Sequence, residues 1–238
     1  MADGSGAMVT PRQSRSELST TRLINAAAEL IAENGYERTT LAAIGKRAGY
    51  SHGIVTRRFG SKEGLLVALI EKMAMGWTET HLKPAVGSST GREALHIRVD
   101  AFRASWRKSA RRMRALYTLM FEALGPIPHL KLRMIELHGY SRESVAAVVQ
   151  LGIDNGTVDG SVDAERVARL FVGALRGAAY QAMLDPDAID IYDALDDLDL
   201  LVDSLLPAPS SIQPRSTQAR STQQQTAASD KKGASARG

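Results

Sequence analysis

The chain has 238 residues and no cysteine, which excludes disulfides, thiol catalysis and thiolate metal sites. Hydrophobic residues make up 44% of it, enough for a buried core, yet no apolar run approaches the roughly 18 residues of a membrane span. The first ten residues lack the basic start and apolar stretch of a signal peptide, so we expect a soluble, cytoplasmic protein without a membrane partner.

The formal net charge is only +4, but the charges are unevenly distributed. Between Asp185 and Asp203 there are eight aspartates and no lysine or arginine. This separation fits a molecule that presents one face to a polyanion, although most charge runs are solvated helix faces and indicate nucleic acid only weakly. The basic residues gather at Lys46, Arg47, Arg57, Arg58 and Lys62, and again from Arg103 to Arg114.

Apolar residues recur at helical spacing, and no alternating β-branched run competes as a strand, so the sequence predicts an all-α fold. The polar segments 1–18 and 207–238 cannot bury enough apolar surface, and we expect both to be disordered. N-cap hydroxyls and terminating glycines or proline predict the first four helices. They run from about Ser19 to Gly35, from Thr40 to Gly49, from His52 to Phe59, and from Ser61 to Pro84.

The pattern continues in longer helices beyond residue 90, giving about nine in all. They form a small N-terminal bundle over residues 19–66, followed by a larger one over 67–206. The later helices run from about Thr90 to Gly125, from His129 to Gly156, from Asp163 to Leu184, and from Ala188 to Leu206.

Residues Thr39 to Phe59 are typical of a helix-turn-helix. Two short helices are joined by the tight turn Gly49-Tyr50-Ser51, in which glycine can adopt a positive φ. A small core of Ile44, Ala48, Phe59 and either Ile54 or Val55 can hold their angle. The exposed side of the second helix is rich in donors, as a helix that enters the major groove requires: His52, Thr56, Arg57 and Arg58.

The stretch TTLAAIGKRAGYSHGIVTRRFGSKEGLL resembles the DNA-binding signature of the TetR family of bacterial regulators, and RLINAAAELIAENGYERTT resembles that family's first helix. The resemblance covers Arg22 to Leu69. It implies that residues 19–66 form a helix-turn-helix DNA-binding domain and residues 67–206 a ligand-binding and dimerisation domain. It implies a homodimeric transcriptional regulator, by family default a repressor, that binds a palindromic double-stranded DNA operator and is released by an unknown small-molecule effector. A DNA-binding regulator without a ligand, or an activator, is the alternative.

The resemblance also implies roles for individual residues. His52 and Gly53 match positions that approach base edges, whereas Thr40 and Lys62 match phosphate contacts. Thr56, Arg57 and Arg58 stand where aromatics and histidine are usual, so we expect stronger electrostatic binding. Gly45 replaces the family's usual alanine and should cost its helix up to about 1 kcal/mol. The expected DNA contacts are Thr40, Ser51, His52, Gly53, Thr56, Arg57, Arg58 and Lys62.

In this family the last two long helices pair across a two-fold axis. The alternative is that their apolar faces close the protomer's own core. The expected dimer contacts are Val167, Leu170, Phe171, Ala174, Ala178, Leu195, Leu198 and Val202.

The middle helices of the family surround an effector cavity, which methionine and aromatic side chains suit. Plain core is the alternative reading of these residues. A cationic ligand held by cation–π contacts and an anionic or acyl ligand held by the basic run from Arg103 to Arg114 are both open. The expected lining residues are Met73, Trp77, Phe102, Trp106, Met113, Tyr117, Met120 and Phe121.

An enzyme and a purely structural scaffold are the competing classes. The five histidines show no metal-site spacing with carboxylates, and there is no phosphate loop or nucleophile motif, so we expect no catalysis, metal or cofactor. A scaffold would leave the basic second helix of the helix-turn-helix unexplained.

Overall fold

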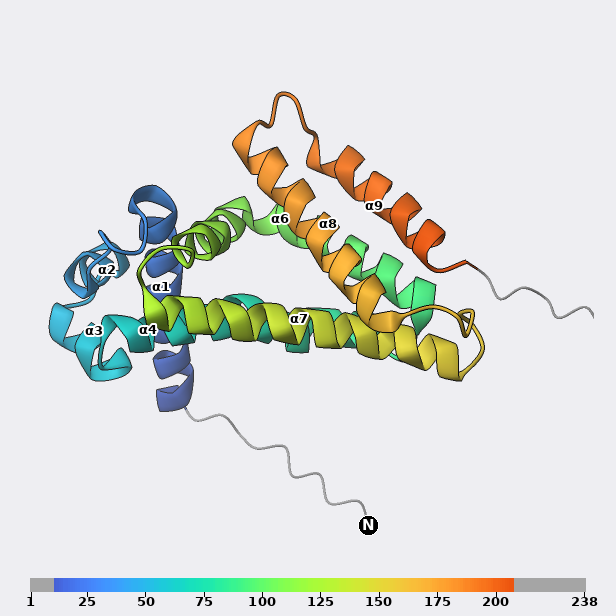
Figure 1. Ribbon diagram of the computed structural model, residues 1–238. Coiled ribbons are helices and arrows are strands. Elements are labelled where there is room, and N and C mark those ends of the chain that lie inside the picture. Colours follow the sequence, from blue (N-terminus) through green and yellow to red (C-terminus); the bar gives the residue numbers. More distant parts are fainter. Residues whose placement is uncertain (1–10, 208–238) are drawn as a thin grey trace, which may run out of the picture.

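The computed structural model describes residues 11–207, and this part of the chain is entirely helical (Figure 1). The predicted all-α fold is therefore confirmed. None of the described helices combines the length and apolar character needed to cross a bilayer. Residues 1–10 and 208–238, for which disorder was expected, lie outside the described residues.

The N-terminal segment corrects one expectation. Residues 1–18 were expected to be disordered, but helix α1 (Pro11–Asn34) already begins at Pro11. Proline is tolerated in the first turn of a helix. The side chain of Arg58 then donates to the carbonyl and the hydroxyl oxygen of Ser16, both at 3.0 Å, and to the hydroxyl of Thr20. This contact with a later helix, which composition cannot show, supports the extra turns.

Three helices follow α1 and complete the N-terminal domain: α2 (Leu41–Ala48), α3 (His52–Phe59) and α4 (Lys62–Ile70). The helical path continues from α4 through η1 (Glu71–Met75), η2 (Thr78–Leu82) and α5 (Lys83–Val86). Pro84 was expected to end it, yet the path reaches Val86. The Lys83 amide bonds the Thr78 carbonyl five residues back, and this wider π turn accommodates the proline that follows.

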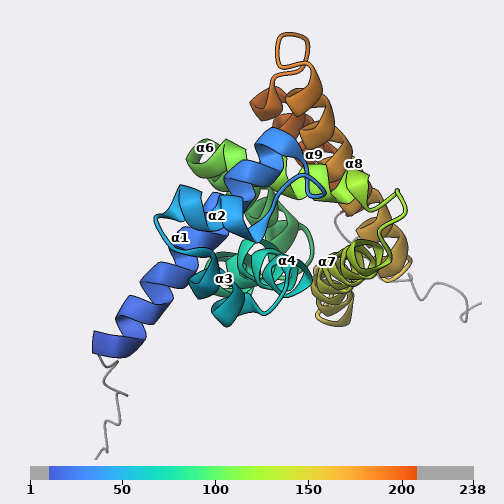
Figure 2. The same cartoon turned by 90° about the vertical axis from the view of Figure 1, so that its left-hand side faces the viewer.

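The remaining helices form the larger part of the molecule. In Figure 1, α7 runs along the length of the molecule, whereas α8 and α9 form a hairpin on one side of it. The N-terminal helices sit at the opposite end from α9, and Figure 2 turns that end toward the viewer. The four bounds are α6 (Gly91–Glu122), α7 (Pro128–Asp154), α8 (Ala164–Leu184) and α9 (Ile191–Leu205).

Two buried clusters hold these helices together. The first combines α1 to α4 with the end of α6 and the start of α7, so the expected boundary after residue 66 does not separate two cores. The second joins the other parts of α6 and α7 to α8 and α9. Because burial of apolar side chains is the main stabilising term, the N-terminal domain is fixed on the larger one by a shared core.

Polar contacts between α6 and α9 join the basic and acidic segments of the sequence. Arg103 pairs with Asp196 at 2.7 Å and with Asp199 at 3.3 Å. His96 places its Nδ1 2.6 Å from Asp199 and its Nε2 3.0 Å from Asp203. Burial alone would lower the pKa of His96, but the hydrogen bonds to Asp199 and Asp203 outweigh it and raise that pKa above its ordinary value.

We expect His96→Asn to lower stability more in mild acid than in mild base. Because the pKa of His96 is raised by folding, its contribution is complete below about pH 6.5 and is lost as the pH rises through the folded value. Urea unfolding of both proteins at about pH 5.5 and about pH 8.5 should give losses that differ by up to about 1 kcal/mol, the scale of a partly exposed ion pair. Equal losses at the two pH values would contradict the assignment.

Candidate nucleic-acid interface and ligand cavity

The helix-turn-helix is built on a left-handed glycine. Gly49 has φ 78°, a conformation that residues with a Cβ rarely adopt, and it turns the chain between α2 and α3. Ile44 and Val55 are fully buried between the helices, whereas Ile54 is 43% exposed. Val55, rather than Ile54, is therefore the core residue of α3.

Gly45 lies where α2 approaches the turn most closely. Its carbonyl accepts the amide of Tyr50 at 2.8 Å. A Cβ added at Gly45 would lie 2.7 Å from the Tyr50 carbonyl oxygen and 3.1 Å from Val55 Cγ2. The expected cost in helix propensity is thus accompanied by a packing requirement that the sequence did not reveal.

The start of α3 presents an open polar surface at the end of the molecule seen in Figure 2. Ser51, His52, Gly53 and Arg57 are exposed, and Thr56 is half-buried. Ser51 occupies the N-cap position without a side-chain cap bond, so its hydroxyl and the first amides of α3 remain available to an anion. A Cβ at Gly53 would meet nothing within 4 Å, which leaves room for a close backbone approach.

Two of the expected DNA contacts are engaged inside the protein. Arg58 is bonded to α1, as described above. Lys62 donates to the Glu37 carbonyl at 2.9 Å, and its Nζ lies 4.3 Å from the centre of the Tyr36 ring. Thr40 is exposed, although its hydroxyl also accepts the Ala43 amide at 3.1 Å and so caps α2. Arg57 makes no hydrogen bond or ion pair within residues 11–207 and is the freest cation of α3.

A polar joint connects this domain to the rest of the chain. Both carboxylate oxygens of Glu122, at the end of α6, accept the Tyr36 amide, at 2.9 and 3.0 Å. The Tyr36 hydroxyl lies 3.1 Å from His129 Nε2, and His129 Nδ1 lies 3.3 Å from Glu63. Burial and the nearby carboxylates, Glu63 first, raise the pKa of Tyr36 to about 12. The phenol therefore stays neutral and keeps its hydrogen.

A cavity of about 430 Å³ lies among η2, α6, α7 and α8. This is within the range of roughly 300–1,000 Å³ that is usual for small-molecule sites. Four of the expected lining residues contribute to it: Met73, Trp77, Phe102 and Met113. No group of three or more histidine, aspartate or glutamate side chains in the described part of the chain is placed to hold a metal ion.

The other four expected residues lie elsewhere. Trp106 packs on the second core, 6.1 Å from the Phe102 ring, and Met120 packs between the two cores. Tyr117 is buried and donates to the Arg176 carbonyl at 3.3 Å. Phe121 is 48% exposed and contacts Tyr180, with ring centres 4.8 Å apart.

The sequence reading missed the cations of the cavity wall, chiefly Arg98 and Arg176. A signal was available: each interrupts an apolar helix face, Arg98 between Leu95 and Phe102, and Arg176 between Val172 and Ala179. The sequence does not show whether these helix faces point into a cavity, because an arginine between apolar residues can also extend its charged end to solvent.

The expected dimer contacts divide into two groups. Leu170 is 43% exposed, and Ala174 and Ala178 are half-buried at the edge of the same surface of α8. The other five close the protomer's own core, which was the alternative left open by the sequence, and so are unavailable to a partner: Val167, Phe171, Leu195, Leu198 and Val202.

These features define the class of the protein: a helix-turn-helix domain joined to a helical domain with a ligand-sized cavity. The family model "Bacterial regulatory proteins, tetR family" matches residues 23–69, the helix-turn-helix and the helices beside it. Over these residues the chain is therefore similar to the DNA-binding region of this family.

Curated relatives match part of the chain, and solved structures share its fold. The chain is 36% identical over 92 residues to the HTH-type transcriptional regulator BetI of Burkholderia mallei, a match that covers 38% of this chain and 47% of BetI. The chain thus spans about half the length of the curated relatives it matches. A TetR transcriptional regulator from Chloroflexus aurantiacus superposes with a TM-score of 0.68 at 23% identity, covering 81% of this chain and 98% of that one. FadR from Bacillus subtilis, solved with stearoyl-CoA, superposes with a TM-score of 0.66 at 20% identity, covering 76% and 96%.

We expect Gly45→Ala to destabilise the protein although alanine is the better helix former. The propensity gain of up to about 1 kcal/mol is outweighed by overpacking against the Tyr50 carbonyl, which costs about 1–3 kcal/mol. Gly53→Ala is the matched control, because a Cβ there meets open space and the change should be neutral or slightly stabilising. Thermal unfolding followed by circular dichroism measures both. A Gly45→Ala protein as stable as the Gly53→Ala protein would show that the close approach does not matter.

Proposed function

We propose that the chain is a transcriptional repressor that binds a palindromic DNA site as a homodimer and releases it when a small molecule enters the cavity. The observation that carries the proposal is the open donor surface at the start of α3, held by a helix-turn-helix that shares its core with the cavity domain. Helices of this kind read base edges with their N-terminal residues while neighbouring groups bind phosphates. The name of BetI, an HTH-type transcriptional regulator, supports the same role.

The coupling between cavity and DNA rests on shared residues. Met73, Leu116 and Leu137 line the cavity and also belong to, or pack on, the core of the N-terminal domain. A ligand that displaces them changes the packing beneath α1 and α4. The π turns of η1 and η2 are departures from regular α-helix in the segment that connects the cavity to the helix-turn-helix. Ligand binding then favours a conformer in which the two α3 helices no longer match the half-sites.

The dimer rests on the outer face of α8. Leu170, Tyr180 and Leu184 are 43%, 39% and 68% exposed there. Between them lie Gly173 and Gly177, where an added Cβ would meet nothing within 4 Å. A face with apolar side chains around small residues lets a second helix approach closely. A two-fold pair through this face can place two α3 helices about one turn of DNA apart.

The DNA role is tested by selecting bound sequences from a random duplex pool and measuring affinity for the recovered site. We expect Arg57→Ala to weaken binding by about 1–3 kcal/mol, or roughly 5- to 150-fold, because Arg57 is free to donate to a base or phosphate. Arg107→Ala, which removes an exposed arginine from α6, is the control for net charge and should bind almost as the wild type does. Failure of the wild type to enrich any sequence over competitor DNA would refute the proposal.

The dimer is tested by Gly173→Glu. The open space at this position means that the protomer tolerates the side chain, whereas a helix packed against α8 would meet a buried, unpaired charge. Sedimentation should show a dimer for the wild type and a large shift toward monomer for the variant. Ala147→Glu, the same change in size and charge at an exposed position of α7, should remain dimeric. A variant at Gly173 that dimerises like the wild type would place the interface elsewhere.

A further inference from the structure

The cavity wall carries an unbalanced charge. Its lining includes the partly buried Arg98 and Arg176 and the exposed Lys108 and Arg112, but neither aspartate nor glutamate. Much of the remaining wall is apolar, including Trp77, Phe102 and Phe171. A charge inside a poorly hydrated space is costly unless it is paired, so an excess of one sign favours a ligand of the opposite sign.

Two of these cations hold donors without acceptors. The Nε atoms of Arg98 and Arg176 are fully buried, and neither has a hydrogen-bond partner within the described residues. Arg98 is nevertheless well anchored, since its Nη2 donates to the carbonyl and the hydroxyl oxygen of Ser144, both at 2.9 Å. An arginine that served only to join α6 to α7 would leave no reason to bury the Nε unpaired.

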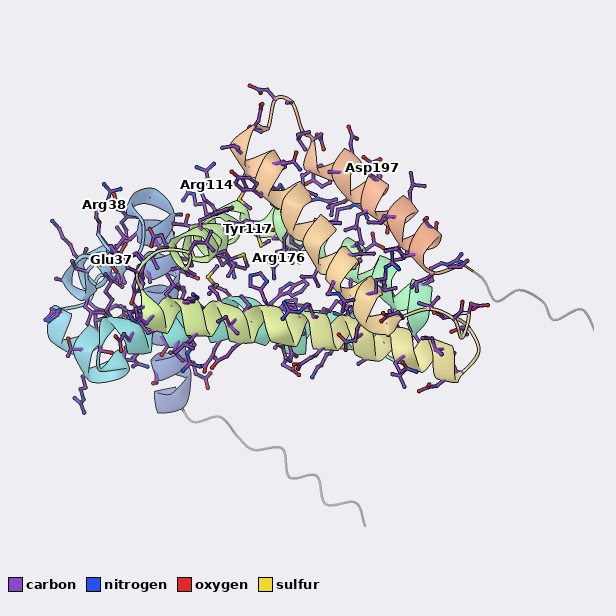
Figure 3. All side chains as sticks on the ribbon, in the orientation of Figure 1. Glu37, Arg38, Arg114, Tyr117, Arg176 and Asp197 are labelled. Carbon is purple, nitrogen blue, oxygen red and sulfur yellow. The ribbon has the colours of Figure 1, made fainter. Side chains whose placement is uncertain are left out.

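Arg98 is poorly solvated, and the surroundings of Arg176 are electropositive. Burial lowers the pKa of Arg98, which shows that its charge is poorly solvated. Burial first, and then the charges of Arg176 and Arg142, lower the pKa of His138 on α7. In Figure 3 the labelled Arg176 and Tyr117 lie between α7 and α8. The Tyr117 hydroxyl donates to the Arg176 backbone carbonyl and so does not supply the side chain with an acceptor.

The carboxylate that contacts a lining side chain is already engaged. Glu79 accepts the Tyr140 hydroxyl at 2.9 Å and pairs with Lys83 at 2.7 Å. Tyr140 lines the cavity, whereas Glu79 does not, so this carboxylate is not part of the lining.

We propose that the effector is an organic anion with an apolar body, whose acidic group is bound by Arg98 and Arg176 and whose body packs against Trp77, Phe102 and Phe171. This inference rests on the proposed role of the cavity as the effector site. It favours the anionic over the cationic ligand, the two that the sequence left open, because an ammonium group would face the guanidinium groups of Arg98 and Arg176 and no carboxylate of the lining.

A matched pair of fluorescent probes tests the sign of the ligand. 8-Anilinonaphthalene-1-sulfonate and N-phenyl-1-naphthylamine share one apolar body, and only the first carries an acidic group. Titrated into the full-length wild type, the sulfonate should bind at least about tenfold more tightly, the effect of a charge-assisted hydrogen bond in a desolvated site. Decanoate should displace it, whereas decan-1-ol at the same concentration should displace far less.

Variants then locate the acidic group. Arg98→Met and Arg176→Met should each lower the affinity for the sulfonate about tenfold and leave the neutral probe nearly unchanged. Arg98→Lys and Arg176→Lys, which keep the charge, should retain part of the preference and guard against loss through misfolding. Arg107→Met and Arg169→Met are the controls, since they remove exposed arginines of the same two helices outside the cavity.

The results separate this inference from the proposed function. Equal affinity of the wild type for both probes, or a sulfonate affinity that Arg98→Met and Arg176→Met leave unchanged, would overturn the anionic ligand while DNA selection still succeeds. An anion preference that depends on both arginines would support the inference even if no DNA sequence were enriched. A loss of sulfonate binding equal to that in Arg107→Met and Arg169→Met would assign it to surface charge and also overturn the proposal.

Discussion

The attachment of the helix-turn-helix to α6 is the constraint on which the other features depend. Glu122 accepts the Tyr36 amide with both carboxylate oxygens. Gly35, the residue before Tyr36, has φ 82° and no room for a Cβ beside that carboxylate. A partly buried carboxylate is stable only while such donors satisfy it. Together with the apolar core beneath it, this joint makes the N-terminal domain move with α6 as a rigid body.

A rigid attachment decides where movement between cavity and DNA can arise. The N-terminal domain cannot tilt by itself without exposing Leu119 and Leu130, which are fully buried in the shared core. The path from α4 to α5 is different, because its π turns interrupt the regular ladder and it contributes Trp77 and Leu82 to the cavity. Packed interfaces shift between discrete arrangements rather than deform continuously. A ligand that contacts the segment from α4 to α5 therefore acts on a connection between the cavity and the N-terminal domain that is already irregular.

The sequence predicted the features that local rules determine, and it missed those that depend on which way a helix face points. Thr40 and Gly49 marked both ends of α2, and Ser61 marked the start of α4, because caps and left-handed glycines are local chemistry. Periodicity could not choose between Ile54 and Val55, nor tell that Phe171 closes the protomer core while Leu170 faces outward. The extra turns of α1 and the engagement of Arg58 are two sides of one long-range contact, which neither segment reveals alone. The positions expected to bind DNA, a ligand or a partner remain predictions.

The basic run of α6 shows how one helix separates charges by face. Residues seven apart lie on nearly the same side of a helix, so Arg98, Ser105 and Arg112 form one row and all three line the cavity. Arg92, His96 and Arg103 form another row, and each pairs with an aspartate of α9. The acidic segment that looked like a separate end of the molecule thus neutralises only the outer row. Because those aspartates pair with the outer row, they do not neutralise Arg98 on the inner row, and the cavity lining keeps a positive charge within a chain of nearly balanced charge.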